Sequence, residues 1–590
     1  MIHAAFDFPR HPLAREDGER LRGVWHEAPA RWLRAARHEE VRAAIAEAEA
    51  AARAGAWVLG GLRYEAAAAF DAALATHEAT ATAPLAEFAV YDKAPEPWPD
   101  QAPAHTGLLD WHDPAPDANA AIERIRGYIR DGDCYQVNLT ARLRAAAGAL
   151  DPAQLFLALH ASQPGGFSLF LLDAQTRAGA ASVSPELFFD WRPVPGAHTS
   201  WLLAAQPMKG TAPRGRDRVD DEAAQAHLRT SEKERAENLM IVDLLRNDLS
   251  RVAQLGTVRV PRLFELHALP TVWQMTSTVT AVSRAGLTLA DAFAALFPCG
   301  SVTGAPKVRA MQIIRELEPT ARGWYCGALG LIQPGGVATF NVPIRTVEFG
   351  DGQLTCGIGS AITLDSEPAA EIAEWRAKSR FLARAEAPVQ ALETLRLQDG
   401  VALRGDAHLA RMQRTARHFG LRLSLTEART YLQAVAAACP DGVWRLRLTC
   451  DAAGRLSHTL AAFTPTAEPV RLALADRPIV TRGPRAEFLA HKTTRRELYA
   501  GFAKPADAFD VILWNEAGEL TECSFGNLAV QLSGQWLTPP LASGLLPGVL
   551  RAELLAQGRV KEARLTRDDL ARAEGLAFFN SLRGWLPAEI

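Results

Sequence analysis

The stretch Gly300-Ser301-Val302-Thr303-Gly304-Ala305-Pro306-Lys307 lies between two segments that carry glutamates at helical spacing. In the first segment, residues 233–244, Glu234 and Glu237 are three positions apart, so both carboxylates lie on one helix face. In the second segment, Glu371, Glu374 and Lys378 share a face in the same way. Four carboxylates on two helices can hold Mg²⁺, which prefers oxygen ligands, although glutamates at this spacing are more often solvated.

Further stretches accompany this one in a fixed order. They are Asp133-Cys134-Tyr135-Gln136-Val137-Asn138-Leu139, Ser184-Pro185-Glu186, Pro207-Met208-Lys209-Gly210-Thr211, Arg322-Gly323-Trp324-Tyr325-Cys326-Gly327 and Asn341-Val342-Pro343-Ile344-Arg345-Thr346. Each alone is compatible with a simple turn. Together, over residues 127–380, they resemble the ordered signature of the chorismate-utilising enzymes. The resemblance implies a large two-sheet α/β sandwich.

The resemblance also implies roles for individual residues. Glu186 would be the general acid that protonates the departing hydroxyl of chorismate, and Lys209 would be the nucleophile. Aminodeoxychorismate synthases of this family carry a lysine here and anthranilate synthases usually carry a small residue, so Lys209 predicts amination at C4. A lysine beside a glycine is otherwise typical of a solvated loop. The implied Mg²⁺ ligands are Glu234, Glu237, Glu371 and Glu374, and the implied substrate-binding residues are Gln136, Thr211, Gly300, Thr303, Gly304, Tyr325, Arg345, Gly359 and Lys378.

The last third contains a second ordered series. Leu392-Glu393-Thr394-Leu395, His408-Leu409-Ala410-Arg411-Met412, Ala490-His491-Lys492-Thr493 and residues 520–527 resemble the fold-type IV pyridoxal-phosphate enzymes. That resemblance implies a smaller domain of two subdomains, with Lys492 as the catalytic lysine that binds the cofactor and Glu522 beside the pyridine nitrogen. The implied phosphate-binding residues are Arg411, Leu546, Gly548, Asn580 and Ser581, with Pro547 in the first turn of a helix.

Composition and length limit the number of domains and the classes of partner that the chain can have. A chain of 590 residues exceeds one hydrophobic core, and the change of pattern before Pro388 predicts domains at 1–384 and 392–590 joined by a linker at 385–391. Both parts are expected to mix α and β, with a helix at 231–249 and a strand at 392–397. A net charge of -3 and the absence of a long apolar run argue against nucleic-acid and membrane partners, and the first residues predict a cytoplasmic protein. The seven scattered cysteines indicate neither disulfides nor a zinc site.

The two resemblances imply one enzyme that converts chorismate and ammonia to aminodeoxychorismate, and then to 4-aminobenzoate and pyruvate, toward folate. Because the chain lacks a Gly-x-Cys-x-Gly glutaminase motif, the ammonia is expected from a separate glutamine amidotransferase subunit. A homodimer through the last third is compatible with the resemblance. Three alternatives are an anthranilate synthase fused to an aminotransferase, an isochorismate or salicylate synthase, and a synthase with a non-catalytic docking module. Gln136 argues against the second, because water-using relatives carry a lysine base there.

Overall fold

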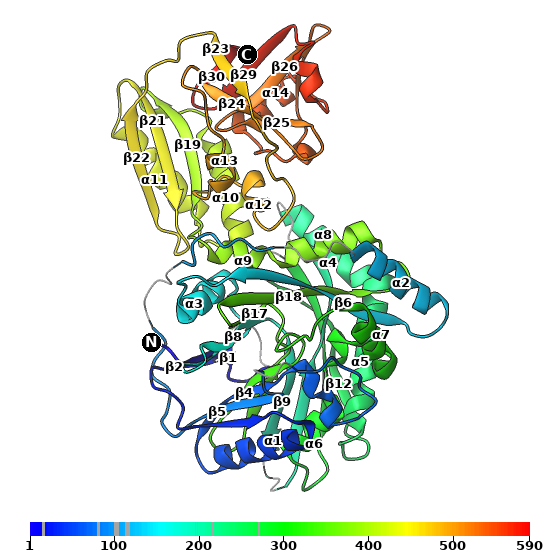
Figure 1. Ribbon diagram of the computed structural model, residues 1–590. Helices are drawn as coiled ribbons and strands as arrows, with labels where there is room; N and C mark the ends of the chain where they lie inside the picture. Colours follow the sequence, from blue (N-terminus) through cyan, green and yellow to red (C-terminus); the bar gives the residue numbers. More distant parts are fainter. Residues whose placement is uncertain are drawn as a thin grey trace. The chain divides into compact units, whose positions relative to one another are not determined.

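The computed structural model describes residues 1–13, 18–79, 83–99, 105–112, 118–194, 196, 199–213, 218–269 and 272–590 (Figure 1). The chain divides into two compact units, Met1–Ala387 and Pro388–Ile590. The division falls within the predicted linker, whereas the assignment of one activity to each part stays a prediction.

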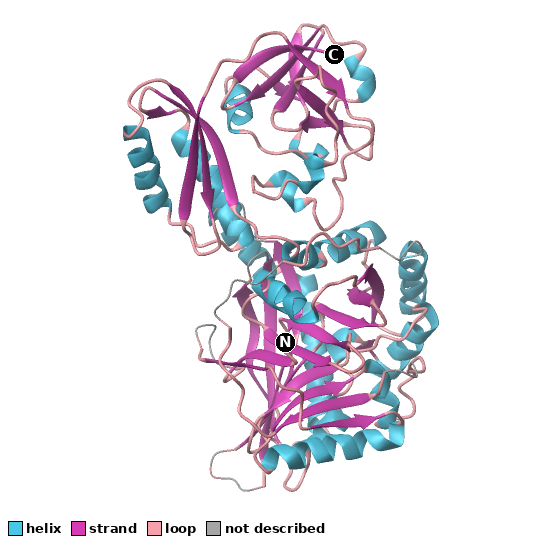
Figure 2. Cartoon of the chain, turned by 60° about the vertical axis from the view of Figure 1, so that its left-hand side comes forward, coloured by secondary structure: helices cyan, strands magenta, loops and turns pink. Residues whose placement is uncertain are grey.

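Two large sheets build the first unit, and Figure 2 shows their strands. Among the described residues, the first sheet has eight strands in the order β14 (Gly304–Ala305), β6 (Gln136–Ala146), β18 (Gln353–Ile362), β17 (Thr346–Gly350), β8 (Ala178–Ser184), β7 (Phe167–Asp173), β1 (Ala4–Pro9) and β2 (Arg20–Trp25). The second sheet has the order β11 (Met208–Pro213), β13 (Val272–Val282), β10 (Trp201–Gln206), β9 (Leu187–Pro193), β16 (Ala338–Asn341), β15 (Ala328–Ile332), β4 (Trp57–Leu62), β5 (Ala86–Tyr91) and β3 (Arg31–Ala35), with β12 (Arg259–Ala268) paired to β13.

The two sheets pack face to face, because one apolar cluster draws side chains from both. Phe6 and Leu169 of the first sheet share this cluster with Leu59 and Leu329 of the second. Helices cover the outer faces through three further clusters. These helices are α1 (His38–Arg53), α2 (Ala118–Arg130), α3 (Pro152–Ser162), α4 (Arg218–Thr230), α5 (Glu232–Ser250), α6 (Leu289–Leu296), α7 (Lys307–Leu317), α8 (Pro368–Lys378) and α9 (Arg380–Ala385), with 3₁₀ turns at Tyr64–Ala69 and Gly300–Val302. The predicted two-sheet sandwich is confirmed.

The second unit consists of two smaller layers. One has strands β20 (Val401–Ala402), β19 (Ala391–Gln398), β21 (Val443–Cys450) and β22 (Leu456–Ala462), packed on α10 (Gly405–Phe419) and α11 (Leu425–Ala437). The other has the order β25 (Leu520–Cys523), β24 (Asp510–Trp514), β23 (Val470–Leu474), β30 (Gly584–Glu589), β29 (Gly575–Asn580), β26 (Asn527–Leu532), β27 (Gln535–Thr538) and β28 (Lys561–Glu562). Its helices are α12 (Glu487–Ala490), α13 (Glu497–Ala500), α14 (Val549–Ala556) and α15 (Arg567–Leu570), with a 3₁₀ turn at Leu541–Ser543. The predicted two-subdomain arrangement is therefore confirmed as well.

Candidate active sites

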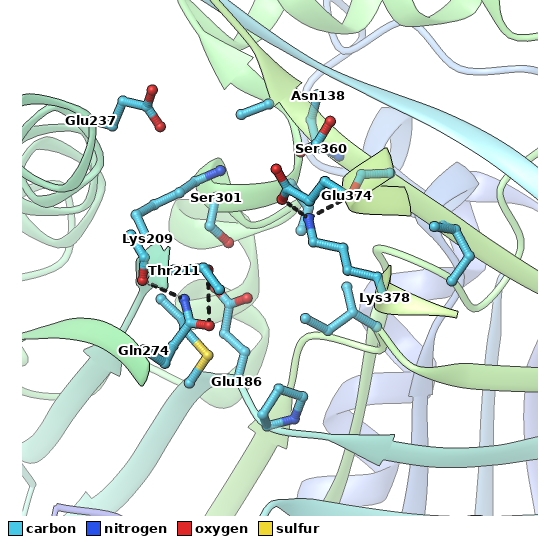
Figure 3. Close-up of a pocket in the computed structure, with 18 of the residues that line it drawn as sticks. Asn138, Glu186, Lys209, Thr211, Glu237, Gln274, Ser301, Ser360, Glu374 and Lys378 are labelled. Carbon is cyan, nitrogen blue, oxygen red and sulfur yellow. Dashed lines mark hydrogen bonds and ion pairs between the residues drawn. The ribbon is translucent and has the colours of Figure 1, made fainter. Parts of the chain in front are cut away.

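A cavity of about 200 Å³ in the first unit lies where α5 and α8 approach the ends of several strands. Figure 3 shows Lys209, Glu186, Glu237 and Glu374 around it. The predicted site residues that line this cavity are Glu186, Lys209, Thr211, Glu234, Glu237, Tyr325, Arg345, Gly359, Glu371, Glu374 and Lys378. The fold thus gathers residues from positions 186 to 378 into one chamber.

A bulge in β11 places Lys209. The pairing of β11 with β13 shifts register between Met208 and Thr211, and an extra residue of this kind turns a side chain out of the regular alternation. Gly210 has a φ of 98°. Side chains rarely tolerate this φ, so the position favours glycine. A Cβ there would also lie 3.1 Å from Cβ of Met275 and 3.2 Å from Oε2 of Glu234.

The surroundings of Lys209 favour its neutral form. Burial lowers its pKa and the positive charge of Lys378 adds to this, while Glu237 and Glu186 oppose it. The backbone is held as well, because Nδ2 of Asn238 donates to the Lys209 carbonyl over 3.1 Å. Oδ1 of Asn238 in turn accepts from Ser277 over 2.5 Å. A neutral amine on a fixed backbone is what a nucleophile requires.

Glu186 is nearly inaccessible to solvent, with 3% of its surface exposed. Burial raises the pKa of its carboxyl, although Ser301 and Lys209 act in the other direction. In the part of the chain that the structure describes, its Oε1 is buried without a hydrogen-bond partner. A carboxyl group with a raised pKa and an unpaired oxygen beside a cavity can carry and deliver a proton.

The carboxylates of α5 and α8 face the same chamber. Burial raises the pKa of Glu234 and of Glu237. The pKa of Glu374 is lowered: burial would raise it, but Lys378, whose Nζ lies 2.7 Å from Oε1, outweighs that effect together with Lys209 and Lys233. Glu371 accepts a short hydrogen bond from Ser360. Across the described ranges, no three metal-ligating side chains gather in one cluster, so a cation here would also need substrate oxygens or water.

Arg345 and Tyr325 complete the wall. Arg345 has a φ of 50°, and burial, with the nearby charge of Arg384, lowers its pKa to about 10. Its guanidinium donates to the amide oxygen of Gln163. The ring of Tyr325 packs so closely on the backbone of Gly357 that a Cβ there would come within 2.3 Å. A buried cation of this kind suits an anionic ligand.

Four of the predicted substrate-binding residues lie behind the cavity wall instead of on it: Gln136, Gly300, Thr303 and Gly304. The Thr303 carbonyl accepts from the backbone amide of Asn138 over 2.8 Å, and Gly304 pairs with Val137. A Cβ on Gly304 would meet the Gln136 carbonyl at 2.2 Å. Gly304 thus allows close backbone packing, and Gly300 makes room for the Leu244 side chain. Their neighbours Asn138 and Ser301 do line the cavity.

Sequence reasoning missed several residues of this cavity. Gln274, which was left out of the predicted site, lines it. Its Oε1 accepts from Thr211 over 3.1 Å and its Nε2 donates to the Gly210 carbonyl over 3.0 Å. Asn138, Ser301 and Ser360 also line the cavity. Gln274 could have been found as the polar residue that faces the lysine strand within the second sheet.

A second cavity, of about 550 Å³, lies within the second unit. All the predicted cofactor-binding residues line it: Arg411, Lys492, Glu522, Leu546, Gly548, Asn580 and Ser581. Burial and the charge of Arg411 lower the pKa of Lys492 to about 8. Burial raises the pKa of Glu522 to about 7, against hydrogen bonds from Tyr499 and the Leu546 amide. The backbone of Lys492 is fixed by a hydrogen bond from the Leu392 amide over 3.0 Å.

One end of this cavity carries a buried polar network. Glu393 is fully buried and accepts from Nε of Arg411 over 2.9 Å and from Nη2 over 2.6 Å. It also lies 2.6 Å from Nδ1 of His408, whose Nε2 lies 2.8 Å from the hydroxyl of Ser581. The pKa of Glu393 falls to about 2, because Arg411 and His408 outweigh its burial. Glu393 therefore orients Arg411 and, through His408, Ser581.

Leu546 and Asn580 of the predicted phosphate site have partners within the protein, and the predicted position of Pro547 in the first helical turn is wrong. The Leu546 amide donates to Glu522 over 3.1 Å. The Asn580 side chain accepts from the Arg583 amide through Oδ1 and donates to the Phe525 carbonyl through Nδ2 over 3.2 Å. Pro547 precedes Gly548, the N-cap of α14, and so lies outside the first helical turn. The Leu546 amide and the Asn580 side chain therefore already have hydrogen-bond partners within the protein.

The fold and the two cavities agree with the comparisons. Residues 14–384 match the family of chorismate binding enzymes, and residues 390–589 match the amino-transferase class IV family. The chain belongs to the chorismate binding enzymes. This confirms the resemblance predicted for the first part, and the second match confirms the one predicted for the last third.

The chain is similar to individual synthases of two kinds. Aminodeoxychorismate synthase component 1 of Klebsiella aerogenes is 45% identical over 254 residues, which are 43% of this chain and 54% of the relative. Anthranilate synthase component 1 of Streptomyces coelicolor is 37% identical over 48% of this chain and 53% of its own length. The chain thus spans about half the length of these curated relatives. Anthranilate synthase component I from Streptococcus pneumoniae shares the fold, with a TM-score of 0.50 and 22% identity over 65% of this chain and 90% of that one.

Within the described ranges, none of the helices is apolar over a length sufficient to cross a bilayer.

Proposed function

We propose that this chain converts chorismate and ammonia to aminodeoxychorismate in its first unit, and aminodeoxychorismate to 4-aminobenzoate and pyruvate in its second. The observation that carries the proposal is the pair of partly buried lysines. Lys209 shares a cavity with a carboxyl acid and two glutamate helices, and Lys492 occupies a separate cavity with Glu522. Because burial lowers both pKa values, each lysine is suited to covalent chemistry.

In the first unit, Arg345 and Tyr325 would hold a carboxylate of chorismate. Glu186 would give its proton to the C4 hydroxyl as that group leaves, and Nζ of Lys209 would form a bond to C2. Ammonia would then add at C4 and displace the lysine from C2. With C2 occupied in the intermediate, the amine enters at C4, which distinguishes this reaction from anthranilate formation.

The donor set of this cavity fits Mg²⁺. Glu237 and Glu374 would hold the ion, with Glu234 and Glu371 close to them, because hard oxygen donors from two helices face one chamber. Burial raises the pKa of Glu234 and of Glu237, and a bound cation would offset the cost of ionising them. When bound, Mg²⁺ would neutralise a substrate carboxylate and fix its position. Lys378 would keep Glu374 ionised.

The second cavity fits pyridoxal phosphate. Arg411, Ser581 and the amide end of α14 at Gly548 would hold the phosphate, and Glu522 would face the pyridine nitrogen. When bound, the cofactor would supply an electron sink for the carbanion formed on the substrate. Lys492 would hold the cofactor, remove the ring proton and return a proton to the departing enolpyruvyl group.

The reaction proposed for the first unit needs a source of ammonia. We propose a separate glutamine amidotransferase subunit as the donor, since the chain carries no Gly-x-Cys-x-Gly motif. The reaction of the second unit consumes the product of the first. A homodimer through the second unit stays a prediction.

The decisive test is a product analysis. The purified chain is given chorismate, ammonium, Mg²⁺ and pyridoxal phosphate, and the products are separated by chromatography. We expect 4-aminobenzoate and pyruvate in equal amounts. Anthranilate as the main product would instead support the anthranilate synthase alternative, and turnover without ammonium would support isochorismate chemistry. Accumulated aminodeoxychorismate with no 4-aminobenzoate would support a non-catalytic second unit.

The Glu237→Gln variant is expected to need about 10- to 100-fold more Mg²⁺ for half-maximal formation of aminodeoxychorismate, because one anionic oxygen ligand is lost. The measurement is the Mg²⁺ dependence of the initial rate. Glu232→Gln is the matched control, since Glu232 is exposed in the first turn of the same helix. An unchanged Mg²⁺ requirement in Glu237→Gln would remove this residue from the metal site.

The His408→Gln variant is expected to bind pyridoxal phosphate about 10-fold more weakly, because Ser581 loses the partner that orients its hydroxyl. Binding of pyridoxal, which has no phosphate, should hardly change. Both affinities are measured by titrating the apoprotein and following the visible absorbance. His458→Gln is the control, because His458 is exposed on β22 and bonds to Tyr431. Equal weakening for both ligands would indicate general damage instead of a phosphate effect.

A further inference from the structure

The second cavity holds more positive charge than the cofactor requires. The arginines that line it are Arg411, Arg445, Arg447, Arg496 and Arg583. Glu522 is the single carboxylate among the described lining residues. Arg411 is neutralised by Glu393, and Arg496 donates to the Ser524 carbonyl. Three arginines therefore stand beside the cavity without a role in the cofactor site.

Arg445 and Arg447 lie on the same face of β21. Strand alternation buries Leu446 and Leu448 in the core and turns the two arginines to the opposite face, about 7 Å apart. Arg447 pairs across the sheet with Thr394 of β19, which also lines the cavity. Two guanidinium groups thus point from one strand toward the same space.

Arg583 comes from the other sheet of the second unit and lines the same cavity as Arg445 and Arg447. It follows β29, donates to the hydroxyl of Thr466 and lies over the rings of Phe463 and Phe509 at 5.4 Å from each centroid. Burial, together with the charge of Arg445, lowers the pKa of Arg583. Throughout the described part of the second unit, Arg445, Arg447 and Arg583 have no ion pair with a carboxylate.

Arg445 and Arg447 are exposed and Arg583 is partly buried. Like charges gathered at a cavity repel each other, and this cost falls when an anion binds. Guanidinium groups bind carboxylates in a planar, two-point fashion. A cofactor phosphate already has Arg411 and Ser581, so the remaining arginines are available to the substrate.

We propose that Arg445, Arg447 and Arg583 form a carboxylate-binding subsite that selects amines carrying two carboxylates for the second unit. This deepens the proposed function and depends on it for the identity of the substrate, since aminodeoxychorismate carries one carboxylate on the ring and one on the enolpyruvyl group. The subsite binds these groups while the amine faces Lys492. Amines with one carboxylate or none bind weakly.

The test uses the full chain loaded with pyridoxal phosphate. Benzene-1,3-dicarboxylate, benzoate and benzamide are titrated as unreactive probes, and binding is followed by calorimetry. We expect wild-type protein to bind the dicarboxylate at least about 10-fold more tightly than benzoate, and benzamide most weakly. Arg445→Gln and Arg447→Gln should each weaken dicarboxylate binding about 10-fold and leave benzamide binding and cofactor affinity unchanged.

Arg455→Gln is the matched control, because Arg455 lies on the adjoining turn, is 83% exposed and pairs with Asp451. Lys variants at 445 and 447 should recover part of the binding, which a purely structural role would not predict. Dicarboxylate binding that is equal in wild type, Arg445→Gln and Arg447→Gln would overturn the subsite. Arginine-dependent dicarboxylate binding without any formation of 4-aminobenzoate would support the subsite and contradict the proposed function.

Discussion

Replacement of Lys209 by alanine is expected to lower 4-aminobenzoate formation from chorismate and ammonium by at least about 1,000-fold, because the nucleophile is removed. The measurement is a chromatographic assay with Mg²⁺ and pyridoxal phosphate present. The cavity and its carboxylates persist, since the bulge in β11 and the contacts of Asn238 involve the backbone at this position. The variant can therefore still bind chorismate.

The residual reaction should change direction. Without the lysine, C2 is open to ammonia, and we expect traces of anthranilate, which the wild type does not form. Lys209→Arg places a lasting positive charge at this position but supplies no nucleophile, so it should be as inactive as the alanine variant. These two outcomes separate a covalent role of Lys209 from a merely electrostatic one.

Two controls accompany this variant. Lys93→Ala changes an exposed lysine of the first unit that pairs with Glu27 and should keep wild-type rates. Lys209→Ala that is supplied with aminodeoxychorismate should form 4-aminobenzoate at the wild-type rate, because the second cavity is intact. Full 4-aminobenzoate production from chorismate by Lys209→Ala would rule out the nucleophile.

Replacement of Lys492 by alanine is expected to stop 4-aminobenzoate formation, with a loss of at least about 1,000-fold, while aminodeoxychorismate accumulates from chorismate. The loss is expected because the same amine both holds the cofactor and moves protons. The variant should also lack the visible absorbance that wild type gains with pyridoxal phosphate. Lys504→Ala, an exposed lysine of the same unit, is the control.

The pH dependence of cofactor attachment gives an independent readout. The neutral amine attacks the aldehyde, and burial lowers the pKa of Lys492 from 10.5 to about 8. Attachment to wild-type apoprotein should therefore accelerate as the pH rises through about 8 and level off above it, whereas an ordinary lysine would still accelerate near 10. Persistent absorbance or persistent 4-aminobenzoate formation in Lys492→Ala would show that another residue holds the cofactor.

The sequence allowed much of both sites to be predicted, because the chemistry uses distinctive residues in short motifs. Glutamates at helical spacing indicated that Glu234 and Glu237 share a face, and both line the first cavity. The motif around Lys492 indicated the second cavity equally well. The glycine-rich stretch at 300–307 was less informative, since glycines are needed for backbone packing as often as for ligand contact.

Other features depend on partners that are distant in the chain. Arg445 and Arg447 alternate with leucines, a pattern typical of any strand with one solvated face, and only the packing of Arg583 from another sheet shows that this face borders a cavity. The Leu546 amide and the Asn580 side chain are already bonded within the protein, which no local motif indicates. Gln274 faces Thr211 only because β13 pairs with β11.

The sequence alone therefore pointed to a two-part organisation, because the pattern changes before Pro388, and to the two lysines, because the ordered motifs around them resemble two families. Helical spacing, a local property, placed the glutamates on shared faces. The tertiary structure decided which polar groups are already satisfied, which glycines serve packing, and where unpaired charge collects. The physical reason is that burial and hydrogen-bond satisfaction depend on every neighbour in space, and these neighbours come from segments far apart in the chain.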